Sequence, residues 1–160
     1  MLQICTIAPD TLELLRKLNS VPELANTRLV GGTALALWLG HRLSIDLDFF
    51  GQVEGDTEII SSYLVRDGFD VNIRSNQKNI HIFTINGVKT DIINYRYLWI
   101  DDLIEEDGIR LGGLKDIAAM KIAAITNRGS KKENQLMPQM LIPTSWEDVK
   151  ERIIAEVRKI

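Results

Sequence analysis

The sequence predicts a small α/β (α+β) domain with a mixed, largely antiparallel sheet that is flanked by helices. Three observations support this fold class. A strand, a tight glycine turn, an apolar helix and a second strand follow one another over residues 29–51. Three short runs rich in β-branched residues fill 69–94, and apolar residues recur at helical spacing in other segments. The length of 160 residues and the absence of a clear boundary predict a single domain over 1–160.

The composition excludes several classes of protein. The net charge of −3 gives no overall basic field, which argues against a large nucleic-acid-binding surface. A single cysteine excludes an intrachain disulfide and a cysteine metal cluster. No basic segment precedes the apolar N-terminal residues, and no apolar run approaches the roughly 18 residues of a membrane helix. We therefore expect a soluble, cytoplasmic protein without signal peptide or membrane span.

Local signals predict the elements of the first half of the chain. The first is a helix that begins at Pro9 and ends before Pro22, and a strand follows at 28–30. Next come an apolar and therefore buried helix that ends near Gly40 and a strand that carries Asp46 and Asp48. The last is a helix from Asp56 to about residue 67, which Gly68 terminates.

The clearest β region has three expected strands, at 69–74, 80–85 and 88–94. Asn86-Gly87 between two such runs is the strongest short-range signal of a hairpin. A two-residue turn pairs Ile85 with Val88, and counting outward places Asp91 opposite Ile82. Asp91 is then an acid without an obvious partner in a paired strand, and we expect it to face the acids of the earlier strand.

The rest of the chain is expected to be mainly helical. We interpret the acidic stretch 95–107 as a solvated loop or a short helix. A helix follows over 114–128, and its predicted packing face, which includes Lys121, consists of Leu114, Ile117, Ala118, Ile122 and Ile125. A polar segment interrupted by Pro138 and Pro143 then leads to a last helix from about residue 144.

Asp46 and Asp48 are the first candidates for chemistry. Residues two apart on a strand share a face, so the two carboxylates lie side by side, opposite Ile45, Leu47 and Phe49. With Asp91 as a third acid they could hold two divalent cations about 3.5–4 Å apart, and Mg²⁺ prefers such oxygen ligands. The alternative is a half-exposed strand with a polar outer face. The acids follow the glycine turn by one helix, which favours phosphoryl or nucleotidyl transfer.

Other residues are candidates for binding phosphate. Gly31-Gly32-Thr33 lies at the mouth of a helix, where backbone N–H groups and the helix dipole attract anions. Lys121 either extends along the apolar helix face to water or faces a triphosphate. Arg42 and Ser44 could contact phosphate or base, and a surface or capping role is the equal alternative. We interpret both histidines as structural, because they lack the spacing of a metal pair.

These motifs resemble the AbiEii/AbiGii-type abortive-infection toxins, a family of minimal nucleotidyltransferases in the polymerase-β superfamily. The resemblance covers about 28–133 and rests on the Gly-Gly-Thr turn, the R-x-S-x-D-x-D-F strand at 42–49 and the D-I-A-A-M-K helix at 116–121. It implies a nucleotidyltransferase core over that range with a helical tail over 134–160. It also implies an NTP substrate, Mg²⁺ or Mn²⁺ as cofactor, an antitoxin as partner and, in some relatives, a tRNA acceptor.

The resemblance further implies that Asp46 and Asp48 bind metal and that Gly32, Thr33 and Lys121 hold the triphosphate. Our hypothesis is therefore metal-dependent transfer of a nucleotide from an NTP to an acceptor, such as RNA, by a toxin. Asp91 would be a third metal ligand and would help to deprotonate the acceptor hydroxyl.

The alternative is a catalytically weak relative that binds nucleotide or a partner protein. It is favoured by Glu133, at a position where the family usually carries Asp, and by a C-terminal part shorter than in relatives.

Overall fold

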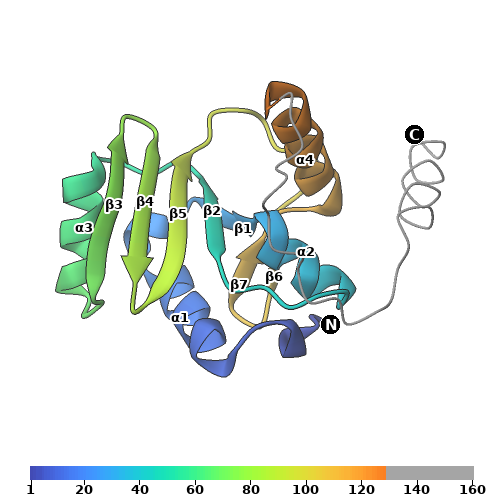
Figure 1. Ribbon diagram of the computed structural model, residues 1–160, viewed down its shortest axis with the longest axis horizontal. Coiled ribbons are helices and arrows are strands. Elements are labelled where there is room, and N and C mark those ends of the chain that lie inside the picture. Colours follow the sequence, from blue (N-terminus) through green and yellow to red (C-terminus); the bar gives the residue numbers. More distant parts are fainter. Residues whose placement is uncertain (129–160) are drawn as a thin grey trace.

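The computed structural model describes residues 1–128, with side chains as far as residue 124 (Figure 1). Its helices are α1 (Pro9–Ser20), α2 (Gly31–Leu39), α3 (Thr57–Arg66) and α4 (Leu114–Arg128), with two short 3₁₀ helices, η1 (Ile4–Thr6) and η2 (Pro22–Leu24). Its strands are β1 (Thr27–Val30), β2 (Leu47–Gly51), β3 (Val71–Gln77), β4 (Ile80–Ile85), β5 (Val88–Asn94), β6 (Ile104–Glu106) and β7 (Ile109–Leu111). No helix in this part of the chain is long and apolar enough to cross a membrane.

The strands form one seven-stranded sheet in the order β3-β4-β5-β2-β1-β7-β6. The pairs β2–β5 and β1–β7 are parallel and the other neighbours are antiparallel, which confirms the predicted mixed, largely antiparallel sheet. The predicted hairpin is also confirmed, because Ile85 pairs with Val88 and Ile82 with Asp91. Asn86 and Gly87 both have positive φ, at 48° and 82°, as a turn of type I′ requires.

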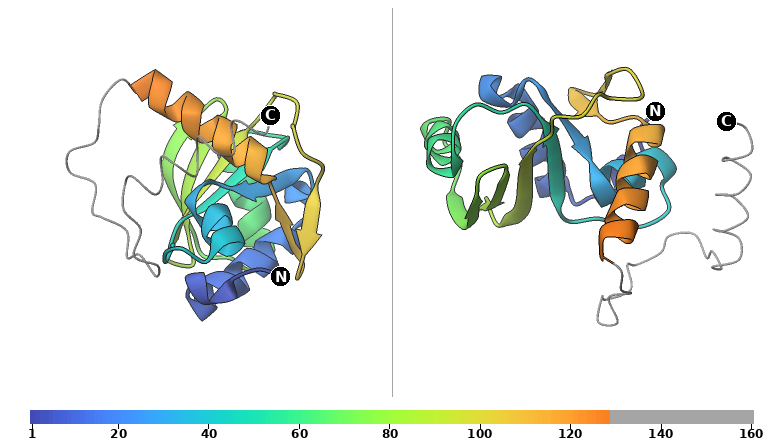
Figure 2. Two further views of the ribbon diagram at one scale, coloured as in Figure 1. Left: turned by 90° about the vertical axis from the view of Figure 1, so that its right-hand side faces the viewer. Right: turned by 90° about the horizontal axis from the view of Figure 1, so that it is seen from above.

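The two faces of the sheet differ in what covers them. Side chains that alternate toward one face, such as Leu47, Phe49 and Ile92, are fully buried in a core shared with leucines of α1 and α3. Figures 1 and 2 show α1 and α3 against this face, whereas α4 projects on the opposite side. Asp48 and Phe50 alternate with the core residues, so they lie on the face that α1 and α3 leave uncovered.

Arg110 on β7 ties the N-terminal elements to the sheet. Its guanidinium donates to the backbone carbonyls of Asn19, Leu24 and Thr27, and its own N–H donates to the Asn19 side chain. One side chain therefore connects α1, η2 and β1, three elements that lie more than 80 residues earlier in the chain.

The interpretation of 95–107 as a loop or short helix was wrong in part. Residues Ile104–Glu106 and Ile109–Leu111 form the β6–β7 hairpin around Asp107 and Gly108, both at positive φ. The pairing of Leu111 with Leu29 attaches β7 to β1. A short strand that is stabilised by pairing with a distant segment has no strong local pattern, so the sequence did not indicate it.

Two predicted faces also need correction. Strand β2 begins at Leu47, so the prediction that Asp46 lies on the strand with Asp48 was wrong. Ile45 also precedes the alternation and is 73% exposed rather than buried with Leu47. On α4, Ile117 is buried as expected, but Leu114 and Ile122 are 46% and 60% exposed and Ala118 is exposed as well. The helix packs mainly on α2, so only part of its predicted apolar face is covered. The predicted last helix and the two prolines before it lie outside the described residues.

Candidate active site

Asp48 and Asp91 face one another across two adjacent parallel strands. Asp48 on β2 is the register partner of Asp91 on β5, and paired residues of neighbouring strands point to the same face. Asp46 immediately precedes β2, two residues from Asp48. The sequence alone suggested that these acids meet, and the β2–β5 pairing brings two of them directly together.

The electrostatics of Asp48 show that the acids interact. Burial raises the pKa of the Asp48 carboxyl, and the negative charges of Asp91 and Asp46 raise it further. Lys89 and Lys121 act in the opposite direction because their positive charges favour the carboxylate. Lys121 on α4 is therefore close enough to affect the acids, although its side chain is exposed.

Gly31 is the first residue of α2 and lies against Asp48. Its φ of +71° belongs to the left-handed region that favours glycine. A Cβ at this position would overlap the Asp48 carboxylate. Both the turn and the close approach of the helix start to the acid therefore require glycine.

The side chain of Arg42 lies across the first turn of α2. No side chain caps this turn, whose leading N–H groups have no partners within the helix. The Arg42 guanidinium lies so close to Gly32 that a Cβ there would overlap it, and its Nη1 donates to the carbonyl of Leu43. An arginine over the positive end of a helix dipole is an arrangement that an anion would stabilise.

Thr33 and Ser44 connect α2 to the segment that carries the acids. Their hydroxyls share a hydrogen bond of 2.8 Å, and both side chains are buried. The Thr33 hydroxyl also donates to the backbone carbonyl of Asp46. The two hydroxyls therefore bond within the protein and fix the position of Asp46, while their roles toward a nucleotide remain a prediction.

Lys89 is a site residue that the sequence analysis missed. Its Nζ donates to both carboxylate oxygens of Asp91, each at 2.8 Å. Burial lowers the pKa of Lys89, but this hydrogen bond and the charges of Asp91, Asp46 and Asp48 outweigh it and raise the pKa. The available signal was the spacing, since Lys89 precedes Asp91 by two residues on the same strand face.

The potential metal ligands at Asp48 suit a hard cation such as Mg²⁺. They are carboxylate oxygens, and the Asp48 carboxylate accepts no hydrogen bond from the part of the chain that the structure describes. Within that same part, no group of three or more acidic, histidine or cysteine side chains is arranged to hold a metal ion. The metal site predicted from Asp46, Asp48 and Asp91 therefore stays a prediction, and both carboxylate oxygens of Asp91 are bonded to Lys89.

Other polar residues near the site hold neighbouring segments of the chain together. Asp116 in the first turn of α4 is buried and accepts from the N–H groups of Ile100 and Asp101. The Arg28 guanidinium lies 4.3 Å from the centre of the Trp99 ring and donates to the Asp101 carbonyl. These contacts hold the segment after β5 against β1 and α4, which is a structural role.

His81 is also structural, as predicted. It is 1% exposed, and its Nδ1 shares a hydrogen bond of 2.7 Å with the Thr57 hydroxyl, whereas its Nε2 has no partner within the described residues.

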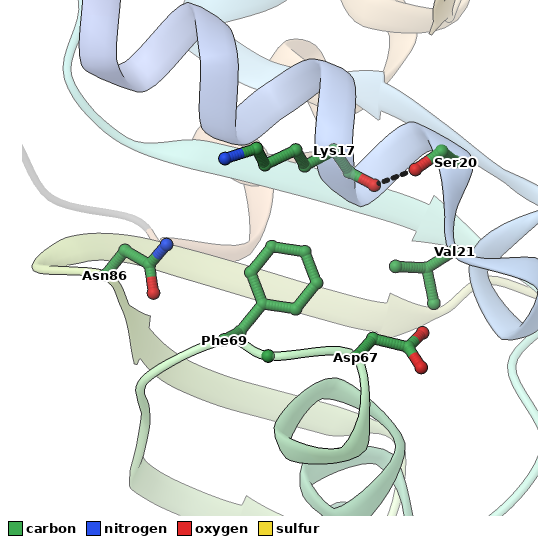
Figure 3. A pocket seen from close by; sticks show the side chains of 7 residues that line it. Lys17, Ser20, Val21, Asp67, Phe69 and Asn86 are labelled. Atoms are coloured by element: carbon green, nitrogen blue, oxygen red, sulfur yellow. Dashed lines mark hydrogen bonds between the residues drawn. The ribbon is translucent and has the colours of Figure 1, made fainter.

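A separate depression of about 510 Å³ lies between α1, the end of α3 and the β4–β5 turn. Figure 3 shows the Phe69 ring in its middle, with Lys17 and Asn86 beside it. None of its lining residues belongs to the acid site, so it is not part of the candidate active site.

Comparison with solved structures shows which fold the protein has. JHP933 from Helicobacter pylori superposes with a TM-score of 0.53 at 18% identity, over 74% of this chain and 58% of that chain. A candidate nucleotidyltransferase from H. pylori has a TM-score of 0.54 at 16% identity, over 93% and 69% of the two chains. The candidate nucleotidyltransferase TM1012 from Thermotoga maritima has a TM-score of 0.53 at 20% identity, over 77% and 90%. The fold is that of nucleotidyltransferases.

The chain belongs to the AbiEii nucleotidyl transferase toxin family of Type IV toxin–antitoxin systems, whose model matches residues 13–111. The match includes the glycine turn and all three acids but ends before Lys121. The Aquifex aeolicus (strain VF5) protein aq_aa25, described as uncharacterized, is 37% identical over 124 residues, which are 76% of this chain. The chain spans 60% of the length of that relative.

Proposed function

We propose that this chain transfers a nucleotide from an NTP to a hydroxyl of an RNA acceptor such as tRNA, with Mg²⁺ or Mn²⁺ as cofactor. The observation that carries the proposal is the register of β2 and β5, which pairs Asp48 with Asp91 beside the uncapped start of α2. The family supports the reaction class, and its Type IV toxin–antitoxin description supports the role of a toxin with an antitoxin partner.

Each part of the site has a role in this reaction. The N–H groups of Gly31, Gly32 and Thr33 bind phosphate oxygens, and Arg42 and Lys121 supply positive charge. Asp46, Asp48 and Asp91 would hold the metal ion, which when bound would neutralise charge on the reacting phosphate and the departing pyrophosphate. The acceptor oxygen bonds to the α-phosphorus as the bond to pyrophosphate breaks, and Asp91 takes the hydroxyl proton. Ser44 acts by holding Thr33.

A second candidate function is a module that binds nucleotide or a partner without turnover. It is favoured by the hydrogen bonds of both Asp91 oxygens to Lys89, which leave this acid engaged. The departure at Glu133 that also motivated this alternative lies outside the described residues.

A transfer assay with each labelled NTP, Mg²⁺ or Mn²⁺ and total RNA distinguishes the two functions. We expect label on RNA with the unmodified chain and a loss of about a hundredfold or more with Asp46→Asn/Asp48→Asn, because the developing charge is then no longer balanced. The matched control is Asp10→Asn/Asp70→Asn, which removes two exposed acids outside the site.

Equal labelling by the site variant and its control would contradict the proposed function. Metal-dependent NTP binding without any transfer would favour the binding module.

A further inference from the structure

Lys89 occupies the side of Asp91 that a cation would need. Its ammonium bonds both oxygens of the Asp91 carboxylate, so this acid has no oxygen without a cationic partner. The same ammonium interacts electrostatically with Asp46 and Asp48. A single positive group thus bonds to Asp91 and interacts electrostatically with the other two acids of the site.

The two partners differ in how freely they can move. The Asp91 side chain is 17% exposed and lies on a strand with neighbours on both sides, β4 and β2. The Lys89 side chain is 48% exposed and has a four-carbon stem that can turn toward water. An ion pair with such an exposed partner stabilises little, so a divalent cation can replace the ammonium at Asp91.

We propose that Lys89 is an exchangeable internal counter-ion that competes with the divalent cation for Asp91. Lys89 balances the charge of Asp91 in the metal-free protein and leaves Asp91 when the cation binds. The released ammonium then lies beside the site, where it can meet the negative triphosphate. This inference rests on the proposed function, since it assumes that the acids bind a divalent cation.

The affinity of the nucleotide-free chain for Mn²⁺ tests the exchange without any assay of activity. Binding is measured by the loss of the EPR signal of free Mn²⁺. We expect Lys89→Met to bind Mn²⁺ about tenfold more tightly than the unmodified chain, because the competing charge is gone. Lys89→Arg should keep the original affinity, since a guanidinium also bonds both oxygens of a carboxylate. The matched control is Lys17→Met, which removes one positive charge from α1 and should leave the affinity unchanged.

The double variant Lys89→Met/Asp91→Asn distinguishes competition for Asp91 from a general effect of charge. We expect the tenfold gain to disappear in it, relative to Asp91→Asn alone. Equal affinities of the unmodified chain and Lys89→Met would overturn the inference, as would a gain that persists without Asp91.

The variant Asp48→Asn separates this inference from the proposed function. Unchanged Mn²⁺ binding by Asp48→Asn would contradict the proposed metal site, whatever Lys89 does. Absence of Mn²⁺ binding in every variant would contradict both. Thermal unfolding of each variant checks that it is folded.

Discussion

Gly31 and Asp48 show how closely backbone conformation and site chemistry are linked in this protein. The left-handed φ of Gly31 turns the chain from β1 into α2, and the missing Cβ leaves room for the Asp48 carboxylate. Burial raises the pKa of the Asp48 carboxyl, and the negative charges of Asp91 and Asp46 raise it further. A substitution at Gly31 therefore acts on backbone strain and on the acid at once.

Gly31→Ala is predicted to impair cation binding as well as stability. The left-handed φ costs an alanine roughly 1–2 kcal/mol, and the new methyl group displaces Asp48. Gly108→Ala is the matched control, because Gly108 has a φ of +73° and its added Cβ would meet nothing within 4 Å. Urea unfolding should show a loss for both variants, and Mn²⁺ binding should weaken for Gly31→Ala alone. Equal Mn²⁺ affinities would show that Asp48 adapts to the methyl group.

Helix α2 and strand β2 depend on each other through buried hydroxyls rather than through apolar packing alone. The Thr33 hydroxyl reaches both Ser44 and the Asp46 carbonyl, so the first turn of the helix holds the segment that leads into the strand. The sequence predicted the helix, the strand and their order. It did not show that the helix side chains hold the acid segment in place, because that contact depends on how the two elements pack.

Thr33→Val is predicted to loosen the acid segment. Valine keeps the shape of threonine but leaves the Ser44 hydroxyl and the Asp46 carbonyl without this partner, at a cost of about 1–3 kcal/mol. Thr27→Val is the matched control, since the buried Thr27 hydroxyl donates to the Leu24 carbonyl at 2.7 Å, away from the acids. Both variants should unfold at lower urea concentration, whereas nucleotide transfer should fall only for Thr33→Val. A similar fall in both would contradict the assigned link.

The stability of the whole molecule depends on pH through two histidines, His81 and His41, whose neutral forms are favoured in the folded chain. Burial lowers the pKa of His81, and the charges of Asp56 and Glu58 oppose this only in part. Burial also lowers the pKa of His41, with a further contribution from Arg42. Because the unfolded chain then takes up protons at higher pH than the folded one, acidification favours unfolding.

The free energy of unfolding is predicted to fall as the pH decreases below about 6.5, the ordinary value for histidine. His81→Asn removes this titration and should lose less stability between pH 7 and pH 5 than the unmodified chain. Urea unfolding at several pH values measures the difference, and His41→Asn reports the share of the second histidine. An identical pH dependence for His81→Asn and the unmodified chain would rule out the contribution of His81.

Features that depend on a few neighbouring residues were predictable from the sequence of this protein. Asn86-Gly87 specifies a turn with two positive φ angles, Asp56 caps α3, and glycines mark the start of α2. Alternation on β2 placed Asp48 away from the core, and the motifs indicated the family. These signals are local because backbone conformation and side-chain periodicity are set within a few residues.

Features that depend on pairing between distant segments became clear only in the folded chain. The Asp48–Asp91 pair requires β5 to lie beside β2, and the three carbonyls bound by Arg110 come from elements over 80 residues away. The β6–β7 hairpin likewise depends on contact with β1. In the sequence only the spacing on one strand connects Lys89 with Asp91, whereas its interaction with Asp46 and Asp48 depends on the folding that brings β2 beside β5.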